Sequence, residues 1–182
     1  MTLFRLEQSP VWYFADFVLY PAALAVGTGM LLWQGAGPGW VLLLAAVLGF
    51  LTWTLIEYCL HRFVLHGVQP FRRWHEIHHQ RPFALIGTST VVSLSLMGLL
   101  VLWPLSLTLG RWIGLSATLG VAAGYLLYVL VHHATHHWKA APGSWMYARK
   151  RDHALHHRPG AHGWYGVTTS FWDRVFLTDR NR

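Results

Sequence analysis

The stretch FVLYPAALAVGTGMLLWQGAGPGWVLLLAAVLGFLTWTLI, residues 17–56, contains no charged side chain. A helix needs about 20 apolar residues to cross the hydrocarbon core of a bilayer, and the breaker QGAGPG at 34–39 divides the stretch into two such lengths. Two more uncharged runs follow, at 82–110 and 112–138. The sequence therefore predicts four transmembrane helices, roughly at residues 11–33, 40–60, 86–109 and 112–131.

The composition agrees with a membrane protein. Hydrophobic residues make up 54% of the 182 residues and charged residues 12%, against about 25% charged in soluble domains. The N-terminus shows no basic segment followed by a short apolar core and a cleavage site, so no cleavable signal peptide is expected. Cys59 is the single cysteine, which excludes an internal disulfide and a cysteine-rich zinc site. We expect one all-α integral membrane domain over residues 1–182.

Basic residues are unevenly distributed among the segments that join the predicted helices. Four Lys/Arg residues lie in 61–82 and eight in 139–182, whereas the loop at 34–39 has none and the turn at 110–111 has one. Under the positive-inside rule, the two basic segments and both termini face the cytoplasm. The net charge of +7 then reflects topology and attraction to anionic lipid, and it gives no reason to expect nucleic acid as a partner.

All thirteen histidines lie in segments that are predicted to face the cytoplasm. Unpaired imidazoles gathered at one depth would repel each other when protonated, so a patterned cluster predicts metal binding. The isolated His162 is more typical of an interfacial side chain. The other twelve form H-x4-H at His61 and His66, H-x2-H-H at 75–79, HHATHH at 132–137 and a second H-x2-H-H at 153–157.

The spacing of the histidines matters because a helix turns about 100° per residue, so positions i, i+3 and i+4 share one face. Each H-x2-H-H can then direct three imidazoles towards one place. HHATHH contains two i, i+4 pairs, His132/His136 and His133/His137. His61 and His66 would lie about 140° apart on a straight helix. They either bind different metals or lie on either side of a helix end.

Ten imidazoles are available when two are counted from H-x4-H, three from each H-x2-H-H and two from HHATHH. A zinc site uses about four ligands, so ten indicate two metals. Two six-coordinate ions offer about twelve positions, which leaves two open for O2 or a bridging hydroxide. The count predicts a dinuclear oxygen-activating centre in the segments 61–82 and 132–182.

The motifs and their flanking residues resemble the membrane fatty acid hydroxylase/sterol desaturase superfamily of histidine-rich di-metal oxygenases. EYCLHRFVLH (57–66) resembles the first box of that superfamily, WHEIHH (74–79) the second and YVLVHHATHH (128–137) the third. DHALHH (152–157), followed by WYGVTTSFWDRVFLTD (164–179), resembles the fourth box and its trailing segment. The resemblance covers about two-thirds of the chain, with four boxes in the expected order and spacing.

The resemblance implies a non-haem di-iron enzyme that uses O2 and two electrons to hydroxylate or desaturate a lipid C–H bond. It also implies a transmembrane bundle with a cytoplasmic helical cap that holds the metals. We expect a separate cytochrome b5-like or ferredoxin-like protein to supply the electrons. Tyr128, four residues before His132, favours the His132/His136 pair and leaves His133 and His137 beside the ligands. The implied metal ligands are His61, His66, His75, His78, His79, His132, His136, His153, His156 and His157, and no catalytic residue beyond them is identified.

The substrate and the metal are less closely defined by the resemblance. Asp152 stands where Tyr is common and Leu177 where Gly usually precedes Thr, so the subfamily stays open. Hydroxylation of a fatty acyl chain or related lipid is expected first, with sterol-type desaturation or carotenoid-ring hydroxylation as alternatives that use the same boxes. Imidazole binds iron and zinc alike, and we expect iron in the active enzyme. Glu57, one turn before His61, either orients a ligand imidazole or is a charge at a helix end.

Residues 75–79 also match H-E-x-x-H, the zinc-protease motif, with Glu76 as general base. A protease would leave at least seven of the other proposed ligands without a role. The soluble di-iron type with repeated Glu-x-x-His is excluded, because only Glu76–His79 has that spacing. A bis-imidazole haem protein would place histidines at matching depths within its helices, whereas no histidine lies in the middle of a predicted crossing.

Overall fold

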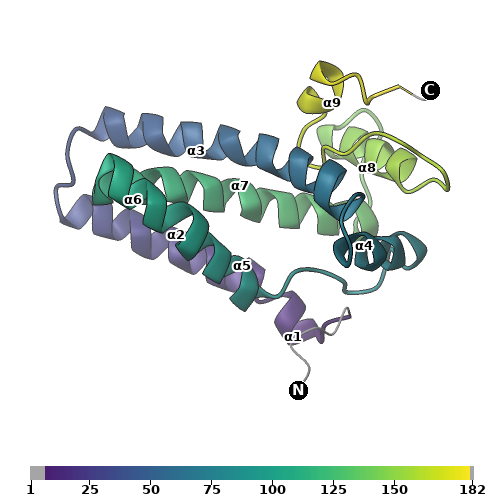
Figure 1. Cartoon of the computed structure of the whole chain (residues 1–182), viewed down its shortest axis with the longest axis horizontal. Coiled ribbons are helices and arrows are strands. Elements are labelled where there is room, and N and C mark those ends of the chain that lie inside the picture. Colours follow the sequence, from purple (N-terminus) through teal and green to yellow (C-terminus); the bar gives the residue numbers. More distant parts are fainter. Residues whose placement is uncertain (1–6, 181–182) are drawn as a thin grey trace. The chain divides into compact units, whose positions relative to one another are not determined.

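The computed structural model describes residues 7–180, and within this range the chain forms helices and no β-strand. Figure 1 shows these helices along the chain. Their bounds are α1 (Pro10–Tyr13), α2 (Asp16–Trp33), α3 (Gly39–Cys59), η1 (Leu60–Leu65), α4 (Phe71–Gln80), α5 (Thr90–Leu96), η2 (Met97–Leu102), α6 (Trp103–Leu109), α7 (Arg111–His137), α8 (Trp145–His156) and α9 (Phe171–Val175), where η marks a π-helix.

Four helical stretches among the described residues are long and apolar enough to span a membrane: Pro10–Trp33, Gly39–Leu65, Thr90–Leu109 and Arg111–His137. They confirm the predicted all-α fold with four membrane-spanning helices. The second stretch continues past the predicted end at 60 and the fourth past 131, so both histidine motifs at these ends begin within helices. The third stretch begins at Thr90 instead of 86.

The chain divides into two compact units. Unit 1 comprises the described residues up to Trp53 together with Leu85–Leu126, and unit 2 comprises Thr54–Ala84 together with the described residues from Leu127 onwards. Helices α3 and α7 contribute residues to both units. All thirteen histidines belong to unit 2, so the candidate site can be described within that unit.

Within unit 1, α3 and α7 approach each other through glycine residues, and Figure 1 shows the two helices side by side. A side chain at Gly49 would overlap the carbonyl oxygen of Ala117, and one at Gly120 would overlap that of Ala46. Helices in a membrane associate mainly by van der Waals packing, because lipid tails are as apolar as the side chains. Small residues at these positions therefore allow the backbone contact that holds the two helices together.

A buried carboxyl group links α2 to α7 in the same unit. Asp16 is 4% exposed, and its Oδ2 atom accepts a hydrogen bond of 2.7 Å from the hydroxyl of Tyr125. The buried ring of Tyr20 lies 4.6 Å from that of Tyr125, measured between centroids. A polar group in an apolar bundle is costly unless it is hydrogen-bonded. This bond therefore favours one register of α2 against α7.

The third membrane-spanning helix changes its winding along its length. It runs as α5, continues as the π-helix η2 and resumes as α6. Pro104 lies in the first turn of α6 directly after η2. Proline cannot donate the backbone hydrogen bond of an α-helix interior, and a change of winding is a usual consequence.

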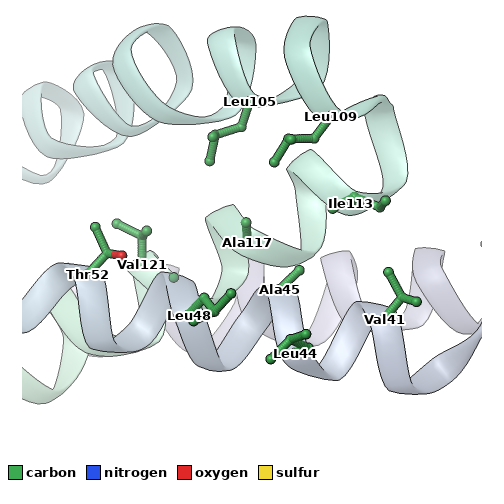
Figure 2. A pocket seen from close by; sticks show the side chains of 11 residues that line it. Val41, Leu44, Ala45, Leu48, Thr52, Leu105, Leu109, Ile113, Ala117 and Val121 are labelled. Carbon is green, nitrogen blue, oxygen red and sulfur yellow. The ribbon is translucent and has the colours of Figure 1, made fainter.

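An apolar groove of about 350 Å³ lies among α3, α6 and α7 of unit 1. Figure 2 shows Leu105 and Leu109 pointing from α6 towards the other two helices. Thr52 carries the one polar atom among the side chains labelled there. Lining of this kind is expected on a surface that lies among lipid tails.

Unit 2 contains shorter and more polar helices. Helix α4 ends two residues before Pro82, because the residue that precedes a proline is disfavoured in a helix. Helix α8 begins after Ser144, whose hydroxyl oxygen accepts a hydrogen bond of 3.1 Å from the backbone N–H of Tyr147. The Lys150 ammonium group donates to two carbonyl oxygens at the end of α7. These contacts fix the ends of the helices that carry the histidines.

Candidate metal centre

Two groups of histidines come together within unit 2, and within each group the candidate ligand atoms all lie within 4.8 Å of one another. They derive from η1 and the residue that follows it, and from α4, α7 and α8. The five-histidine group consists of His61, His66, His75, His79 and His156. The four-histidine group consists of His78, His132, His136 and His153. Of the predicted ligands, His157 alone belongs to neither group.

Within each group, pairs of rings face each other through their Nε2 atoms. The Nε2 atoms of His61 and His75 are 2.9 Å apart, and those of His136 and His153 are also 2.9 Å apart. Two imidazoles at right angles on one ion, each at about 2.1 Å, would have nitrogens about 3.0 Å apart. The donor atoms are all imidazole nitrogens, which suit zinc, copper, iron and nickel. The two groups therefore fit two metal ions of this class.

The π-helix η1 explains why His61 and His66 belong to the same group. The backbone N–H of His66 donates a hydrogen bond of 3.3 Å to the carbonyl oxygen of His61, five residues earlier. This i→i+5 pattern brings residues five apart close to the same side of the helix, and the two ring centroids are 5.3 Å apart. The helix ends at Leu65, between the two histidines, as one predicted alternative requires. The other alternative, that they bind different metals, is wrong, because both histidines belong to the same group.

Each H-x2-H-H motif contributes to both groups instead of pointing three rings at one place. On α4, His75 and His79 join the five-histidine group and His78 joins the four-histidine group. On α8, His156 joins the first and His153 the second. Around a helix axis, i and i+4 differ by about 40°, whereas i+3 lies about 60° to the other side of i. That offset divides each motif between two neighbouring groups.

His157 lies against members of both groups. Its ring stacks on that of His79 with 4.1 Å between centroids, and it lies 4.5 Å from His153 and 4.8 Å from His136. The same four residues line a cavity of about 340 Å³. Both ring nitrogens of His157 are buried and have no hydrogen-bond partner within the described structure. Because unsatisfied buried polar atoms are costly, this ring fits a role in binding a ligand.

Burial keeps the imidazoles of the site neutral. Desolvation, with a smaller contribution from His79, lowers the pKa of His78 to about 4. The pKa of His66 is lowered to about 4 and that of His157 to about 2, in both cases first by burial and then by neighbouring imidazoles. A metal binds only the neutral ring. The site is therefore in its metal-binding form at neutral pH.

Two backbone carbonyl groups orient two rings of the five-histidine group. Nδ1 of His61 lies 2.6 Å from the carbonyl oxygen of Tyr165, and Nδ1 of His156 lies 2.8 Å from that of Gly163. A carbonyl oxygen can only accept, so each Nδ1 carries the hydrogen and each Nε2 keeps its lone pair. Metal-binding histidines are commonly oriented in this way. Sequence reasoning missed these carbonyls, because a backbone oxygen leaves no signal in residue type.

Glu57 does not orient an imidazole directly, contrary to one sequence-based expectation. Its carboxylate is buried and accepts hydrogen bonds from the backbone N–H groups of Val167 and Thr168. The other expectation, a charge at a helix end, agrees with its place two residues before the end of α3, but the residue is buried, with 3% of its surface exposed. The carboxylate instead holds the loop that contains Tyr165 and Gly163.

Other candidate residues lie outside the two groups. His133 and His137 stack on each other with 4.4 Å between ring centroids, and His162 is exposed. Glu76, the general base of the protease interpretation, is about half exposed and forms a salt bridge of 3.1 Å with Arg72. A surface ion pair on α4 therefore accounts for this glutamate.

Comparison with known proteins identifies the class to which this fold and site belong. The family model described as fatty acid hydroxylase matches residues 46–178. This range contains every member of the five-histidine and four-histidine groups, and His157 as well. The chain belongs to the fatty acid hydroxylase family, as its histidine boxes indicated, and it is a multi-pass membrane protein.

Curated relatives extend the match. The chain is 30% identical to the ceramide very long chain fatty acid hydroxylase scs7 of Schizosaccharomyces pombe, over 96% of this chain and 52% of that protein. It is 33% identical to the dihydroceramide fatty acyl 2-hydroxylase FAH2 of Arabidopsis thaliana, over 74% of this chain and 60% of the relative. It is 32% identical to the fatty acid 2-hydroxylase of Mus musculus, over 72% of this chain and 38% of that protein. The chain thus spans about half the length of these relatives.

A solved structure has the same fold. The structure described as full length scs7p, with only the hydroxylase domain visible, superposes with a TM-score of 0.82. The match covers 97% of this chain and 68% of that one, at 23% sequence identity. The arrangement of helices is therefore shared although most side chains differ.

Proposed function

We propose that this protein is an O2-dependent, non-haem di-iron membrane monooxygenase that hydroxylates a C–H bond of a fatty acyl chain. One observation carries the proposal: four histidine motifs converge in two imidazole groups in a chain of the fatty acid hydroxylase family. The proposed ligands are the members of the two groups together with His157. The count of ten gives each of two ions about five imidazoles and leaves about one open position on each.

The substrate class follows from the relatives. The FAH2 protein and the mouse relative are described as 2-hydroxylases, one acting on the fatty acyl chain of dihydroceramide and the other on a fatty acid. We therefore assign hydroxylation at carbon 2 of a fatty acyl chain, free or amide-linked in a ceramide-type lipid. Sterol-type desaturation and carotenoid-ring hydroxylation, the alternatives from the motifs alone, have no comparable support among these relatives.

The chain contributes geometry and charge to this reaction. Bound iron would supply the reductive activation of O2 that C–H oxidation requires. The histidines hold the metal positions with neutral rings, since burial lowers the pKa of His66 and His78 to about 4. All-imidazole ligation adds no negative charge, unlike the Glu-x-x-His sites of soluble di-iron bundles. Such ligation favours the lower oxidation state of an ion, the state from which oxygen activation begins.

The two electrons would come from a separate cytochrome b5-like or ferredoxin-like protein on the cytoplasmic side. Support for this sidedness comes from the twelve Lys/Arg residues in 61–82 and 139–182, four and eight respectively, under the positive-inside rule. The same basic segments have the charge that an acidic carrier would complement. Both termini would then also face the cytoplasm.

Metal content tests the centre of the proposal. We expect about two metal ions per chain in protein prepared anaerobically and shown to be active. Glu76→Gln is the matched control on α4, since this exposed side chain forms a surface ion pair with Arg72 and belongs to neither histidine group, and it should keep its metals and most of its turnover. Fewer than about two ions per chain in fully active protein would contradict the proposal, and complete loss of activity in the control would favour a protease.

Lipid analysis tests the reaction. The chain is expressed, with an electron donor, in cells that lack 2-hydroxylated acyl chains, and the lipids are compared with those of cells that express His136→Ala. We expect acyl chains with one additional oxygen at carbon 2 in cells that express the unchanged chain, and none in cells that express His136→Ala. A new double bond, or an oxidised sterol or carotenoid in place of the 2-hydroxy acyl chain, would replace the assignment with one of the alternatives.

A further inference from the structure

The segment between α8 and α9 has two buried contacts with the five-histidine group. These are the carbonyl groups of Tyr165 and Gly163, which accept hydrogen bonds from Nδ1 of His61 and His156. Tyr165 and Gly163 are both buried. We call residues 163–168 the support loop. The position of the two rings depends on where this loop holds its carbonyl oxygens.

The support loop has an unusual backbone. Trp164, which lies between Gly163 and Tyr165, has a φ of 51°, a value that residues other than glycine rarely adopt. A side chain at Gly163 would overlap the carbonyl oxygen of Thr178. The backbone N–H of Trp164 donates to that same oxygen at 3.0 Å. A conformation of this kind persists only where the surroundings hold it in place.

Glu57 holds one end of the support loop. One carboxylate oxygen accepts hydrogen bonds from the backbone N–H groups of Val167, at 2.7 Å, and Thr168, at 2.9 Å. The other oxygen accepts from the Thr168 hydroxyl at 2.6 Å. Glu57 is itself buried one turn before His61 in the sequence. The carboxylate therefore ties the loop to the helix that leads into η1.

Asp173 holds the middle of the support loop. It is fully buried at the start of α9. Its Oδ1 atom accepts hydrogen bonds of 2.8 Å from the backbone N–H of Tyr165 and from the Thr178 hydroxyl. Its Oδ2 atom accepts one of 2.8 Å from the N–H of Gly166. Backbone N–H groups bound to a carboxylate make strong, charge-assisted hydrogen bonds.

The four-histidine group has less support. Nδ1 of His78 and Nδ1 of His153 are both buried, and neither has a hydrogen-bond partner within the described structure. Their Nε2 atoms face other members of the same group at 3.1 and 2.9 Å. The rings of His78 and His153 are therefore not oriented by a hydrogen bond at Nδ1, in contrast to those of His61 and His156.

We propose that Glu57 and Asp173 are positioning residues that act through the support loop on His61 and His156 and strengthen metal binding at the five-histidine group alone. The four-histidine group is then the more weakly binding and more readily exchanging position. This inference rests on the proposed function, in that the two groups each bind a metal ion. Loss of such an orienting contact typically weakens metal binding about 10- to 100-fold.

The test uses zinc as the probe metal in the full-length protein. Zinc-loaded protein is mixed with a chelator, and the release of zinc is followed over time. We expect two zinc ions per chain that leave in two phases. His153→Ala should remove the fast phase and His61→Ala the slow one, which assigns the phases to the two groups.

Glu57→Gln and Asp173→Asn are the decisive variants. Each should accelerate the slow phase and weaken zinc binding there about 10- to 100-fold, while the fast phase stays unchanged. Glu76→Gln, the same chemical change on an exposed side chain, should alter neither phase. A general loss of structure would instead accelerate both phases together, and that result would overturn the positioning role.

Thr168→Val is a milder variant in case the carboxylate changes prevent folding. It removes only the hydroxyl donor to Glu57 and should weaken zinc binding about fivefold in the slow phase alone. No effect on the slow phase in this variant would also overturn the inference. Fewer than two zinc ions in the wild-type protein would count against the proposed function, whereas two ions that respond equally to the variants would count only against the support loop.

Discussion

His157 is the residue whose surroundings most clearly require a ligand. Its ring lies against members of both groups, and its two nitrogens are buried without a partner in the described structure. Sequence spacing placed it among the ten ligands, beside His153 and His156 on the same motif. The structure brings it near both groups but assigns it to neither, so its role as a ligand stays a prediction.

Replacement of His157 tests that role. We expect His157→Ala to lose metal from the purified protein and to lower hydroxylation at least about tenfold, because a proposed ligand is removed. His162→Ala serves as the control, since His162 is exposed and outside both groups. Metal analysis and lipid turnover provide the two measurements. Full metal content with full activity in His157→Ala would remove this residue from the ligand set.

The lowered pKa values predict how acid affects the metal-free protein. The pKa of His66 and of His78 is about 4 in the folded chain and about 6.5 in an unfolded one. Below pH 6.5 the unfolded chain therefore binds protons that the folded chain does not, so stability falls as the pH drops from about 6.5 to 4. Thermal unfolding at a series of pH values measures this. Stability that stays constant across the range would contradict the prediction.

At the scale of the helix, η1 and the glycine contacts show how backbone geometry positions side chains. A change of winding at η1 brings His61 and His66 into one group, which an ideal α-helix would not do. In unit 1, the absence of side chains at Gly49 and Gly120 allows α3 and α7 to touch through their backbones. Neither effect follows from hydrophobic periodicity, since one depends on a local change of winding and the other on the absence of a side chain at two positions.

The glycine contact between α3 and α7 gives a prediction with a matched control. Gly120→Ala should destabilise the protein by about 1–3 kcal/mol, because the new methyl group would overlap the carbonyl oxygen of Ala46 and overpacking costs about that much. Gly29→Ala on α2 meets nothing within 4 Å, and alanine is the better helix former, so this variant should be neutral or slightly stabilising. Unfolding in detergent measures both. Equal stability of the two variants would show that the contact is unimportant.

At the scale of the whole molecule, the distribution of charge predicts which segments face the cytoplasm. In a chain whose Cys59 is replaced by alanine, single cysteines are introduced at the exposed positions Gln34 and Arg158. A membrane-impermeant thiol reagent should label Gln34→Cys on intact cells and Arg158→Cys only after lysis, as the positive-inside rule requires. The reverse pattern would place the metal centre on the opposite side of the membrane.

The sequence was sufficient for the fold class, the family and the residue types of the site. Uncharged runs predicted the four membrane-spanning helices, since a bilayer excludes charge over about 20 residues. The histidine boxes indicated the family that the match over 46–178 then established. Predictions failed where the direction of a side chain depends on tertiary packing: Glu57 does not contact an imidazole, and the H-x2-H-H motifs do not each point at one place.

Sequence alone determined that this chain enters a membrane and which side chains can bind metal, because apolar length and ligand chemistry are properties of the residues themselves. Only the tertiary structure decided how the histidines divide into two groups, because this depends on helix winding at η1 and on the angles between helices. The tertiary structure alone also brought the carbonyl groups of Tyr165 and Gly163 within hydrogen-bond distance of Nδ1 of His61 and His156, respectively. Backbone carbonyls are present at every residue, and folding selects which of them meet an imidazole.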